Sequence, residues 1–485
     1  MLKSTDTSST HHFDSEMNTA QRSDIIPINE PRAFDIGEVF FSTTDAKGRI
    51  LAGNDVFVRI SGYSYRDLVG APHNIIRHPD MPRVVFKLLW QYLESGRTIA
   101  AYVKNMAKDG RYYWVVALVT PIVNGYLSVR FKPSSPLLGT VAGLYTELAA
   151  LERKIEAEPG GSRQKGMVAS QNLLVEKLAS LGFADYDTFM RVAMLTEIRE
   201  RNKALKKNGP RAPKGTPLKA SESSTAVLSQ SCATVGHAVD VLFDHMDNMT
   251  SVENVIGSTD RFISDSAHAM KILCLNAMIE STRLGDSARA ISIVADWLNS
   301  SLASALSETD ILSRIFARVL TDMRIALFEL ACAKLQVEVM HSFARSLGGT
   351  GAEKRVASHE ETVRLVQMLC KSMSEQMSHA FKVLSILPET SSSLIKGVEL
   401  INKQQRTLRF LHVAGNVEIA RLPDQTTLKN VFDEVAGLIG RTNDELVSLQ
   451  DAVGAMKNVM ERSAAHRTAA ALAVGNVAEL SGSLA

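Results

Sequence analysis

A long run of apolar residues spaced three and four apart occupies the second half of the chain and limits the folds open to it. From about residue 223 the sequence is rich in Ala, Leu, Ser and Val and has almost no proline. This spacing places apolar side chains along one stripe of a helix, and a sustained seven-residue repeat is typical of a coiled coil. The stripe comprises Val235, Val239, Leu242, Met246, Met249, Ile256, Ile263, Ala267, Met270 and Cys274, with one polar interruption at Asp260. It predicts an all-α region in which long helices pack as an antiparallel coiled coil or four-helix bundle.

Length and composition indicate a soluble protein with several structural units. The 485 residues exceed the size at which a single core stops growing, about 250–300 residues. The formal net charge of +2 gives no overall attraction to nucleic acid, and no apolar run approaches the roughly 18–20 residues that span a bilayer. The four cysteines lie far apart, as expected of small buried side chains in a reducing compartment. We therefore expect a cytoplasmic protein without nucleic-acid partners or membrane insertion.

Changes in composition divide the chain into successive segments. The predicted segments are a disordered tail at residues 1–33, an α+β domain at 34–133, a helical connector at 137–206, a linker at 207–222 and a helical bundle at 223–485. The tail is assigned from its Ser, Thr, Asp and Asn content, and the linker from its Lys, Gly and Pro content. The predicted fold class is therefore multidomain, with an α+β domain first and an all-α region last.

Turn and strand signals predict the order of elements in the α+β domain. Two short strands come first, short helices and one longer helix follow, and three strands close the domain. The strands are expected at 38–43, 49–52, 98–105, 111–120 and 126–131, and the helices at 54–62, 64–69 and 83–93. Asp109 and Gly110 join two of the strands, and this dipeptide is a strong hairpin signal.

A stiff polar loop at residues 74–82 is the candidate binding element of this domain. Arg77, His78 and Asp80 fall within four positions, and Pro79 and Pro82 restrict the backbone around them. An arginine fork, an imidazole and a carboxylate beside an aromatic residue suit a planar polar ligand. The structural alternative is a helix-entry loop in which the aspartate caps the following helix and pairs with the arginine.

The same loop carries a resemblance to a known family. Residues 54–63 and the string Pro-His-Asn-x-x-Arg-His-Pro-Asp-Met-Pro at 72–82 resemble the flavin-binding PAS domain of bacterial aerotaxis receptors. The likeness continues to Arg130 and spans about a hundred residues with almost no gaps. It implies a PAS fold that holds FAD non-covalently, with the redox state of the flavin as the signal. The residues that it implies at the flavin site are Asn54, Arg77, His78, Asp80, Trp90 and Asn105.

Two features bear on the identity and behaviour of this cofactor. Thr98 and Ile99 stand where the family usually has a Pro-Trp pair, so flavin affinity or redox behaviour differs here if that Trp packs against the flavin. His78 or His73 is alternatively an axial ligand of haem. Because both histidines lie in the stretch shared with flavin-binding domains, FAD is the expected cofactor and haem the alternative.

A second resemblance lies in the helical half of the chain. Residues 272–286, together with 291–296, resemble the hairpin tip of methyl-accepting chemotaxis proteins. The resemblance implies contacts between receptors and binding of the chemotaxis histidine kinase and its coupling protein. The matched contact positions are Ile272, Leu275, Glu280, Arg283 and Ile293. The stretches 267–271 and 288–290 depart from the pattern, so we expect binding, leave kinase control open and do not expect adaptation by methylation.

An internal repeat suggests that one chain contains two such hairpins. Residues 273–286 align without gaps on 411–424, with identities at Leu, Glu, Arg, Leu and Asp. The glycine cluster at 348–351 lies between them and predicts a turn. We expect two hairpins, 223–347 and 355–485, with four arms of roughly 60–70 residues, each about 90–105 Å long if helical. The interpretation is an intrachain pseudo-dimer with both tips at one end, and the alternatives are a homodimer or two short bundles.

Together these patterns predict a sensor rather than an enzyme. The sequence has no recognisable nucleophile–base pair, P-loop or metal-spaced cluster. The predicted function is redox or oxygen sensing, in which FAD in the PAS domain controls the bundle and, through it, the chemotaxis kinase complex. One alternative is a scaffold that binds chemoreceptor arrays without switching the kinase, and another is a haem-based gas sensor.

Overall fold

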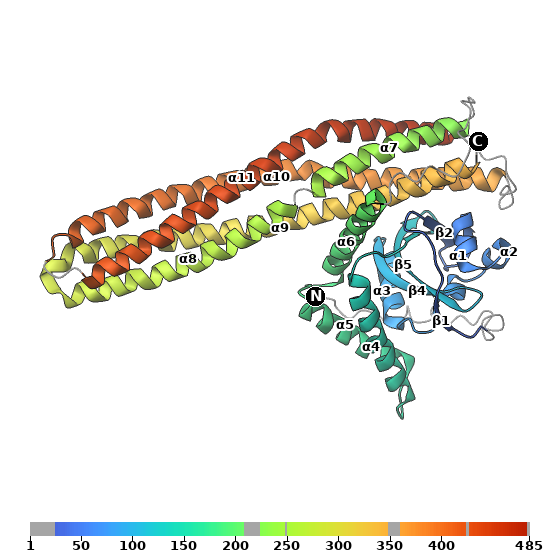
Figure 1. Cartoon of the computed structure of the whole chain (residues 1–485), viewed down its shortest axis with the longest axis horizontal. Coiled ribbons are helices and arrows are strands. Elements are labelled where there is room, and N and C mark those ends of the chain that lie inside the picture. The colour runs from blue at the N-terminus through green and yellow to red at the C-terminus, as the bar shows by residue number, and fades with distance from the viewer. Residues whose placement is uncertain (1–24, 208–223, 248–249, 348–358, 423–425, 483–485) are drawn as a thin grey trace. The chain divides into compact units, whose positions relative to one another are not determined.

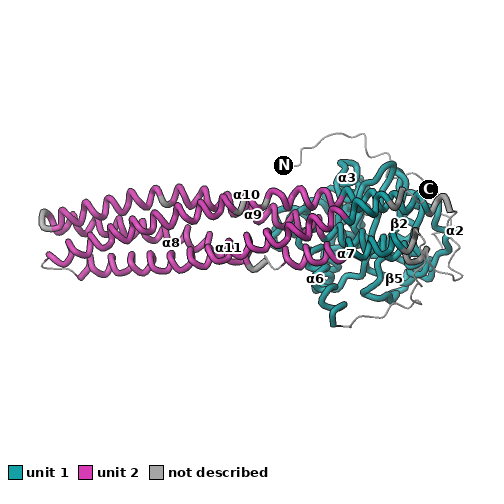
Figure 2. Tube along the Cα trace, turned by 90° about the horizontal axis from the view of Figure 1, so that it is seen from above, with its two compact units in different colours: residues 1–236, 331–375, 473–485 teal, residues 237–330, 376–472 magenta. Residues whose placement is uncertain are grey.

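The computed structural model describes residues 25–207, 224–247, 250–347, 359–422 and 426–482. Most of the predicted tail, the predicted linker, the glycine cluster at 348–351 and Pro423 therefore lie outside the described residues. The chain falls into two compact units (Figure 2). Unit 1 comprises residues 1–236, 331–375 and 473–485, and unit 2 comprises 237–330 and 376–472.

A twisted sheet with short helices on one face forms the first part of unit 1 (Figure 1). Its strands are β1 (Ile28–Pro31), β2 (Val39–Asp45), β3 (Ile50–Gly53), β4 (Ile99–Met106), β5 (Arg111–Ile122) and β6 (Gly125–Phe131). The strand order is β1-β5-β6-β2-β3, with β4 also paired to β5. All pairs are antiparallel except β1 with β5.

The first strand begins before the predicted domain boundary at residue 34. Residues 28–31 were expected in a disordered tail, whereas the structure places them in β1. The backbone N–H of Ile28 donates to the carbonyl of Gly110 at 2.8 Å, and that of Arg32 donates to Tyr112 at 2.7 Å. The pairing partner lies some eighty positions away in the chain, so local composition gives no sign of it.

Three short helices and one longer helix lie between β3 and β4, in the predicted order. They are α1 (Asp55–Ser61), α2 (Tyr65–Leu68), the 3₁₀ helix η3 (His73–Ile76) and α3 (Arg83–Glu94). Asn54 caps α1 by accepting from the N–H of Phe57 at 3.2 Å, and Ser64 forms a capping box with Asp67. The predicted hairpin also forms, and Gly110 in its turn has φ 86°, which favours glycine.

Three helices follow the sheet as the predicted connector, and a buried carboxylate holds the residues just before the first of them. The helices are α4 (Leu137–Ala157), α5 (Arg163–Ser180) and α6 (Tyr186–Lys207). The carboxylate of Glu197 in α6 accepts from the N–H groups of Ser134 and Ser135 at 2.6 and 2.9 Å, just before α4. It also accepts from the hydroxyl of Tyr102 in β4 at 2.7 Å. One fully buried side chain therefore joins β4, α4 and α6.

A second buried carboxylate joins the connector to the helix after the polar loop. Pro82 gives α3 no side-chain cap. Instead Glu152 of α4 accepts from the N–H groups of Arg83 and Val84 at 2.8 and 3.0 Å. An anion at these N–H groups satisfies donors that a helix leaves unpaired, and it complements the helix dipole. The start of α3 is therefore fixed by α4.

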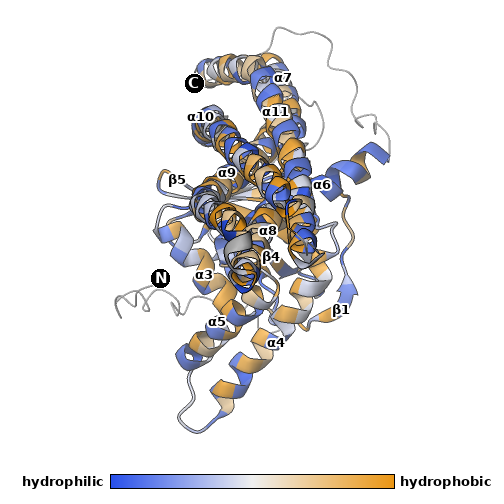
Figure 3. Ribbon diagram, turned by 90° about the vertical axis from the view of Figure 1, so that its left-hand side faces the viewer, coloured by the Kyte–Doolittle hydropathy of each residue, from blue (hydrophilic) through white to orange (hydrophobic). Residues whose placement is uncertain are grey.

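The C-terminal region is helical, as predicted. Its helices are α7 (Ser224–Asp247), α8 (Thr250–Arg283), α9 (Arg289–Leu347), α10 (His359–Ile419) and α11 (Thr426–Gly482), with a short 3₁₀ turn η4 (Gly285–Ala288). Hydrophobic and hydrophilic residues alternate along these long helices (Figure 3), as expected of helices that bury one face. The helices α9, α10 and α11 have 59, 61 and 57 residues, whereas the first expected arm is divided between α7 with 24 residues and α8 with 34.

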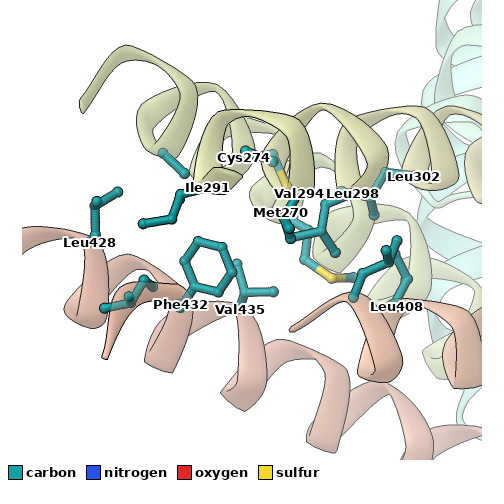
Figure 4. Packing of buried hydrophobic residues seen from close by; sticks show 14 of the residues in the cluster. Met270, Cys274, Ile291, Val294, Leu298, Leu302, Leu408, Leu428, Phe432 and Val435 are labelled. Atoms are coloured by element: carbon teal, nitrogen blue, oxygen red, sulfur yellow. The ribbon is translucent and has the colours of Figure 1, made fainter. Parts of the chain in front are cut away.

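The residues around both predicted tips pack into one hydrophobic cluster in unit 2 (Figure 4). The cluster includes Met270 and Cys274 of α8, Leu408 of α10 and Phe432 of α11. Gly415 permits the close contact with α11, because a Cβ atom there would lie 2.1 Å from the Phe432 ring. Both helix pairs, α8 with α9 and α10 with α11, therefore turn at the same end of unit 2.

Candidate functional site

Alternate residues of the sheet form a polar inner face beneath α1, η3 and α3. We use "inner face" for the face that carries Ser42, Asn105, Tyr113, Ser128 and Arg130, all of which are buried. Strand register places these residues together: Ser42 pairs with Ser128, and Asn105 with Tyr113. The helices contact the same face, since Phe57 of α1 stacks on Phe40, and Trp90 of α3 meets Tyr126 edge-on at 5.5 Å.

Arg130 is the most unusual residue on the inner face. Only 3% of it is exposed, and among the described residues no carboxylate forms an ion pair with it. Its guanidinium donates to the hydroxyl of Ser42 at 3.0 Å and to Nε2 of His73 at 2.6 Å. It also lies 5.5 Å from the centre of the Phe57 ring. Burial lowers the pKa of Arg130 to about 10. A buried cation without a counterion is costly unless something else compensates it.

His73 is held neutral beside this cation. Burial, followed by the nearby charge of Arg130, lowers the pKa of His73 well below its ordinary value. Its Nε2 therefore carries a lone pair that accepts from Arg130 and faces the hydroxyl of Ser42 at 3.1 Å.

This neutral histidine predicts a stability that falls in acid. The unfolded chain takes up a proton at His73 below about pH 6.5, while the folded chain does not, so the free energy of unfolding decreases as pH falls through that value. Between pH 7 and 5.5 we expect the free energy of unfolding of the wild type to fall by about 1 kcal/mol more than that of His73→Gln. Urea unfolding at both pH values measures the difference. Equal losses in the two proteins would show that His73 takes up its proton in the folded state.

Three further polar atoms on the inner face have no hydrogen-bond partner among the described residues. They are Nδ2 of Asn105 and the hydroxyls of Tyr113 and Ser128, all buried. Nearly all buried polar groups in folded proteins are hydrogen-bonded, so each exception calls for an explanation. Burial raises the pKa of Tyr113, which keeps its hydroxyl protonated as a donor. The inner face thus presents donors from three strands together with one uncompensated cation.

The two central residues of the polar loop, Arg77 and His78, have different surroundings. The guanidinium of Arg77 donates to the carbonyl of Met81 at 3.2 Å and lies 3.9 Å above the Phe86 ring. Its backbone pairs with that of Asn105, so the loop is joined to the inner-face strand β4. His78 is buried: its Nδ1 accepts from the N–H of Asp80 at 3.1 Å, and its ring meets Tyr112 edge-on. The prolines and these contacts restrict the loop on both sides of His78.

A cleft of about 600 Å³ opens on the outer side of this loop. Its lining includes Arg77, His78, Arg83, Glu152 and Arg153. The lining carries three arginines and one carboxylate, Glu152, and of the arginines Arg83 pairs with Glu156 at 2.6 Å, so cationic groups outnumber anionic ones in the cleft. An anionic part of a ligand would be favoured there.

The remaining predicted residues are spread around the domain. Both oxygen and nitrogen of the Asn54 amide are engaged by backbone groups of α1 and β2. Asp80 is exposed and accepts from Lys104 at 3.0 Å; partial burial raises its pKa, but Lys104 outweighs this and lowers it overall. The helix alternative, in which Asp80 caps α3, is wrong, since Glu152 does so. Trp90 lies half-buried one turn beyond Phe86 on α3.

Sequence reasoning missed Ser42, Tyr113, Ser128 and Arg130 as site residues. A signal was present in β6, where Ser128 and Arg130 alternate with Leu127, Val129 and Phe131, and all five residues are buried. A charged residue in such a strand faces either water or a specific partner.

The predicted partner positions lie at the surface of the α8–α9 tip. Ile272, Leu275 and Ile293 are exposed by 61%, 43% and 49%. Glu280 and Arg283 form an ion pair at 3.3 Å on the same helix. Large apolar side chains that remain exposed together indicate a contact surface.

Metal-binding clusters and membrane-spanning helices are both absent from the described residues. Within the described ranges, no group of three or more His, Cys, Asp or Glu residues is arranged to hold a metal ion. In the same part of the chain, no helix is long and apolar enough to cross a membrane.

Comparison with known proteins confirms the fold predicted for the N-terminal part. Residues 50–128 match the family model described as the PAS fold. The aerotaxis receptor of Escherichia coli strain K12 is 40% identical over 127 residues, which is 25% of this chain and 25% of that receptor. The chain thus spans a quarter of the length of this relative.

Two further relatives differ in how much of the chain they cover. The nitrogen fixation regulatory protein of Klebsiella pneumoniae is 31% identical over 86 residues, 18% of this chain and 17% of that protein. Biofilm dispersion protein BdlA of Pseudomonas aeruginosa is 21% identical over 340 residues, 69% of this chain and 68% of that protein. The chain therefore combines a PAS domain with a helical region, and the similarity to BdlA covers most of the chain.

Proposed function

We propose that this chain is a redox or oxygen sensor that binds FAD at the inner face of its PAS domain and signals through its helical region. The observation that carries the proposal is the buried Arg130 without a counterion, beside three buried polar atoms without partners. A ring system with several hydrogen-bonding atoms would satisfy all of these groups at once. The similarity to an aerotaxis receptor supports a sensing function, and the resemblance of residues 72–82 to flavin-binding PAS domains supports FAD as the cofactor.

The residues present fit a flavin. Asn105, Tyr113, Ser128 and Arg130 supply donors, and Trp90 supplies a half-buried aromatic wall. When bound, FAD supplies reversible uptake of electrons and protons, which alters the hydrogen bonds that its ring requires. The cationic cleft beside Arg77 would suit the phosphates of the same molecule.

A continuous set of contacts leads from this face to the helical region within unit 1. Asn105 and Tyr102 lie on β4, and the hydroxyl of Tyr102 donates to Glu197 of α6. One turn along α6, Arg201 pairs with Glu338 of α9 at 2.8 Å. We propose that a rearrangement of hydrogen bonds at Asn105 shifts β4 and is transmitted by Glu197 and Arg201, as a two-state change.

We further propose that the α8–α9 tip binds the chemotaxis histidine kinase and its coupling protein. The exposed residues Ile272, Leu275 and Ile293 support this, together with the ion pair of Glu280 and Arg283. A scaffold of chemoreceptor arrays that does not switch the kinase would use the same tip. Kinase activity measured with oxidised and reduced protein separates the two functions.

The absorption spectrum of the purified full chain tests the cofactor. We expect a flavin band at about 450 nm, release of FAD on denaturation, and weaker retention of FAD in Arg77→Ala. The surface variant Arg66→Ala on α2 serves as the control. A Soret band would replace flavin by haem, and a folded protein that stays colourless after incubation with FAD would overturn the proposal.

A further inference from the structure

One wall of the cationic cleft comes from the connector rather than from the sheet domain. The cleft lies between the polar loop, the start of α3, the end of β4 and the helix α4, which contributes Ala149, Glu152 and Arg153 to its lining. Its volume of about 600 Å³ lies within the range of about 300–1,000 Å³ that is typical of ligand sites. Helix α4 follows the last strand of the sheet. A ligand in this cleft would therefore contact the sheet domain and the connector together.

The lining of the cleft has an apolar part and a cationic part. Met81, Met106 and Ala149 are buried and apolar. The three arginines are more exposed than these residues. An apolar surface beside exposed cations suits a ligand that combines a flat ring with an anionic group, as a nucleotide does.

Arg153 differs from the other two arginines of the cleft, since it forms no hydrogen bond or ion pair with any residue that the structure describes. Arg83 pairs with Glu156. Arg77 donates to the carbonyl of Met81 and lies over an aromatic ring. A guanidinium carries five N–H donors in a planar fork. Those of Arg153 are therefore available to a ligand in the cleft.

The backbone that carries Arg153 is held in place from two sides. The preceding residue, Glu152, accepts from the N–H groups of Arg83 and Val84 at 2.8 and 3.0 Å. It also accepts from the hydroxyl of Ser170 in α5 at 2.8 Å. Helix α4 is therefore fixed between α3 and α5 at the level of Arg153. A cation on a fixed helix binds an anion at a lower cost in entropy than one on a mobile segment.

The charge of Arg153 acts on the polar loop across the cleft. Partial burial raises the pKa of Asp80, but nearby basic groups outweigh it and lower the pKa overall; in decreasing order they are Lys104, His78 and Arg153. The carboxylate of Asp80 already accepts from Lys104 at 3.0 Å. An anion bound between the loop and α4 would therefore be attracted by Arg153.

We propose that Arg153 binds the diphosphate of FAD, so that the connector helix α4 forms part of the cofactor site. The inference rests on the proposed function and adds a specificity to it, because riboflavin has no phosphate and cannot make this contact. A guanidinium and a phosphate form two parallel charge-assisted hydrogen bonds. Since Glu152 joins α4 to the start of α3, the bound diphosphate would also hold the connector against the sheet domain.

Titration of the cofactor-free full chain with FAD and with riboflavin tests this contact. We expect Arg153→Ala to raise the dissociation constant of FAD about 10- to 100-fold and to leave that of riboflavin within about twofold of the wild-type value. Arg153→Lys keeps the charge but loses the planar fork, so its affinity for FAD should be intermediate. Lys154→Ala is the matched control, since Lys154 is an exposed cation on α4 outside the cleft lining. It should bind both flavins as the wild type does.

The two titrations separate this inference from the proposed function. If Arg153→Ala binds FAD as tightly as the wild type, α4 is not part of the cofactor site, while the flavin sensor still stands. An equal loss of FAD and riboflavin would show that Arg153 supports folding rather than the diphosphate, and the inference would again be wrong. A wild-type chain that binds neither flavin would overturn the proposed function, and this inference with it.

Discussion

Replacing Arg130 by leucine is expected to release the cofactor while leaving the folded domain at least as stable as before. The guanidinium is buried without a carboxylate partner, so its removal takes away a desolvated charge. His73 and Ser42 lose a donor but remain 3.1 Å apart, close enough to satisfy each other. FAD would lose a charge-assisted hydrogen bond, so its dissociation constant should rise about 10- to 100-fold.

Two measurements on the same protein separate cofactor binding from folding. Flavin titration gives the dissociation constant, and thermal unfolding of the cofactor-free protein gives the stability. Arg111→Leu, an exposed arginine on β5, is the control and should change neither. If Arg130→Leu unfolds the domain while the purified wild type holds no cofactor, Arg130 has a structural role and the proposed site is wrong.

The largest loss of stability is expected from Glu197→Ala. This carboxylate accepts from two backbone N–H groups and from the hydroxyls of Tyr102 and Ser135, all at 2.9 Å or less. Alanine would leave these buried donors without an acceptor and would create a small cavity. We expect the free energy of unfolding to fall by about 3–5 kcal/mol, because each abandoned buried donor costs about 1–3 kcal/mol and the costs are not fully additive.

Urea unfolding followed by circular dichroism measures this loss. Glu200→Ala is a matched control, since Glu200 lies one turn further on α6 and, among the residues that the structure describes, pairs with Lys203 alone, at the surface. The free energy of unfolding of that variant should lie within about 0.5 kcal/mol of the wild-type value. A comparable loss in both variants would mean that α6 is stabilised by its helix-forming residues rather than by the bonds of Glu197.

Local patterns predicted the elements of this chain well where neighbours in sequence determine the structure. Caps at Asn54 and Ser64, the hairpin at Gly110 and the long one-faced helices all follow from residues within a few positions of one another. The family resemblance added the PAS fold, which the comparison confirms for residues 50–128.

Contacts between distant residues were beyond such reasoning. The strand β1 depends on β5, the start of α3 depends on Glu152, and Arg130 lies beside His73 only because the sheet and η3 meet. The six residues predicted for the flavin site remain a prediction. In the structure Asn105 lies on the inner face, and Arg77 and His78 line the cleft. Asn54 caps α1, Trp90 lies on α3, and Asp80 is exposed. They are separated because adjacent residues in a loop or strand point in different directions.

The shared core of α8, α9, α10 and α11 also determines how the two halves of the bundle assemble. When a four-helix bundle forms from two separate polypeptides, its assembly rate depends on their expression levels. Related polypeptides can also replace one another in the bundle. Here both halves come from one translation product, so their effective concentration is fixed by the connecting chain. Folding of the bundle is then independent of dilution. Each half is also free to change its surface without a matching change in the other, as Ile272 and Phe410, the residues just before the two repeats, already illustrate.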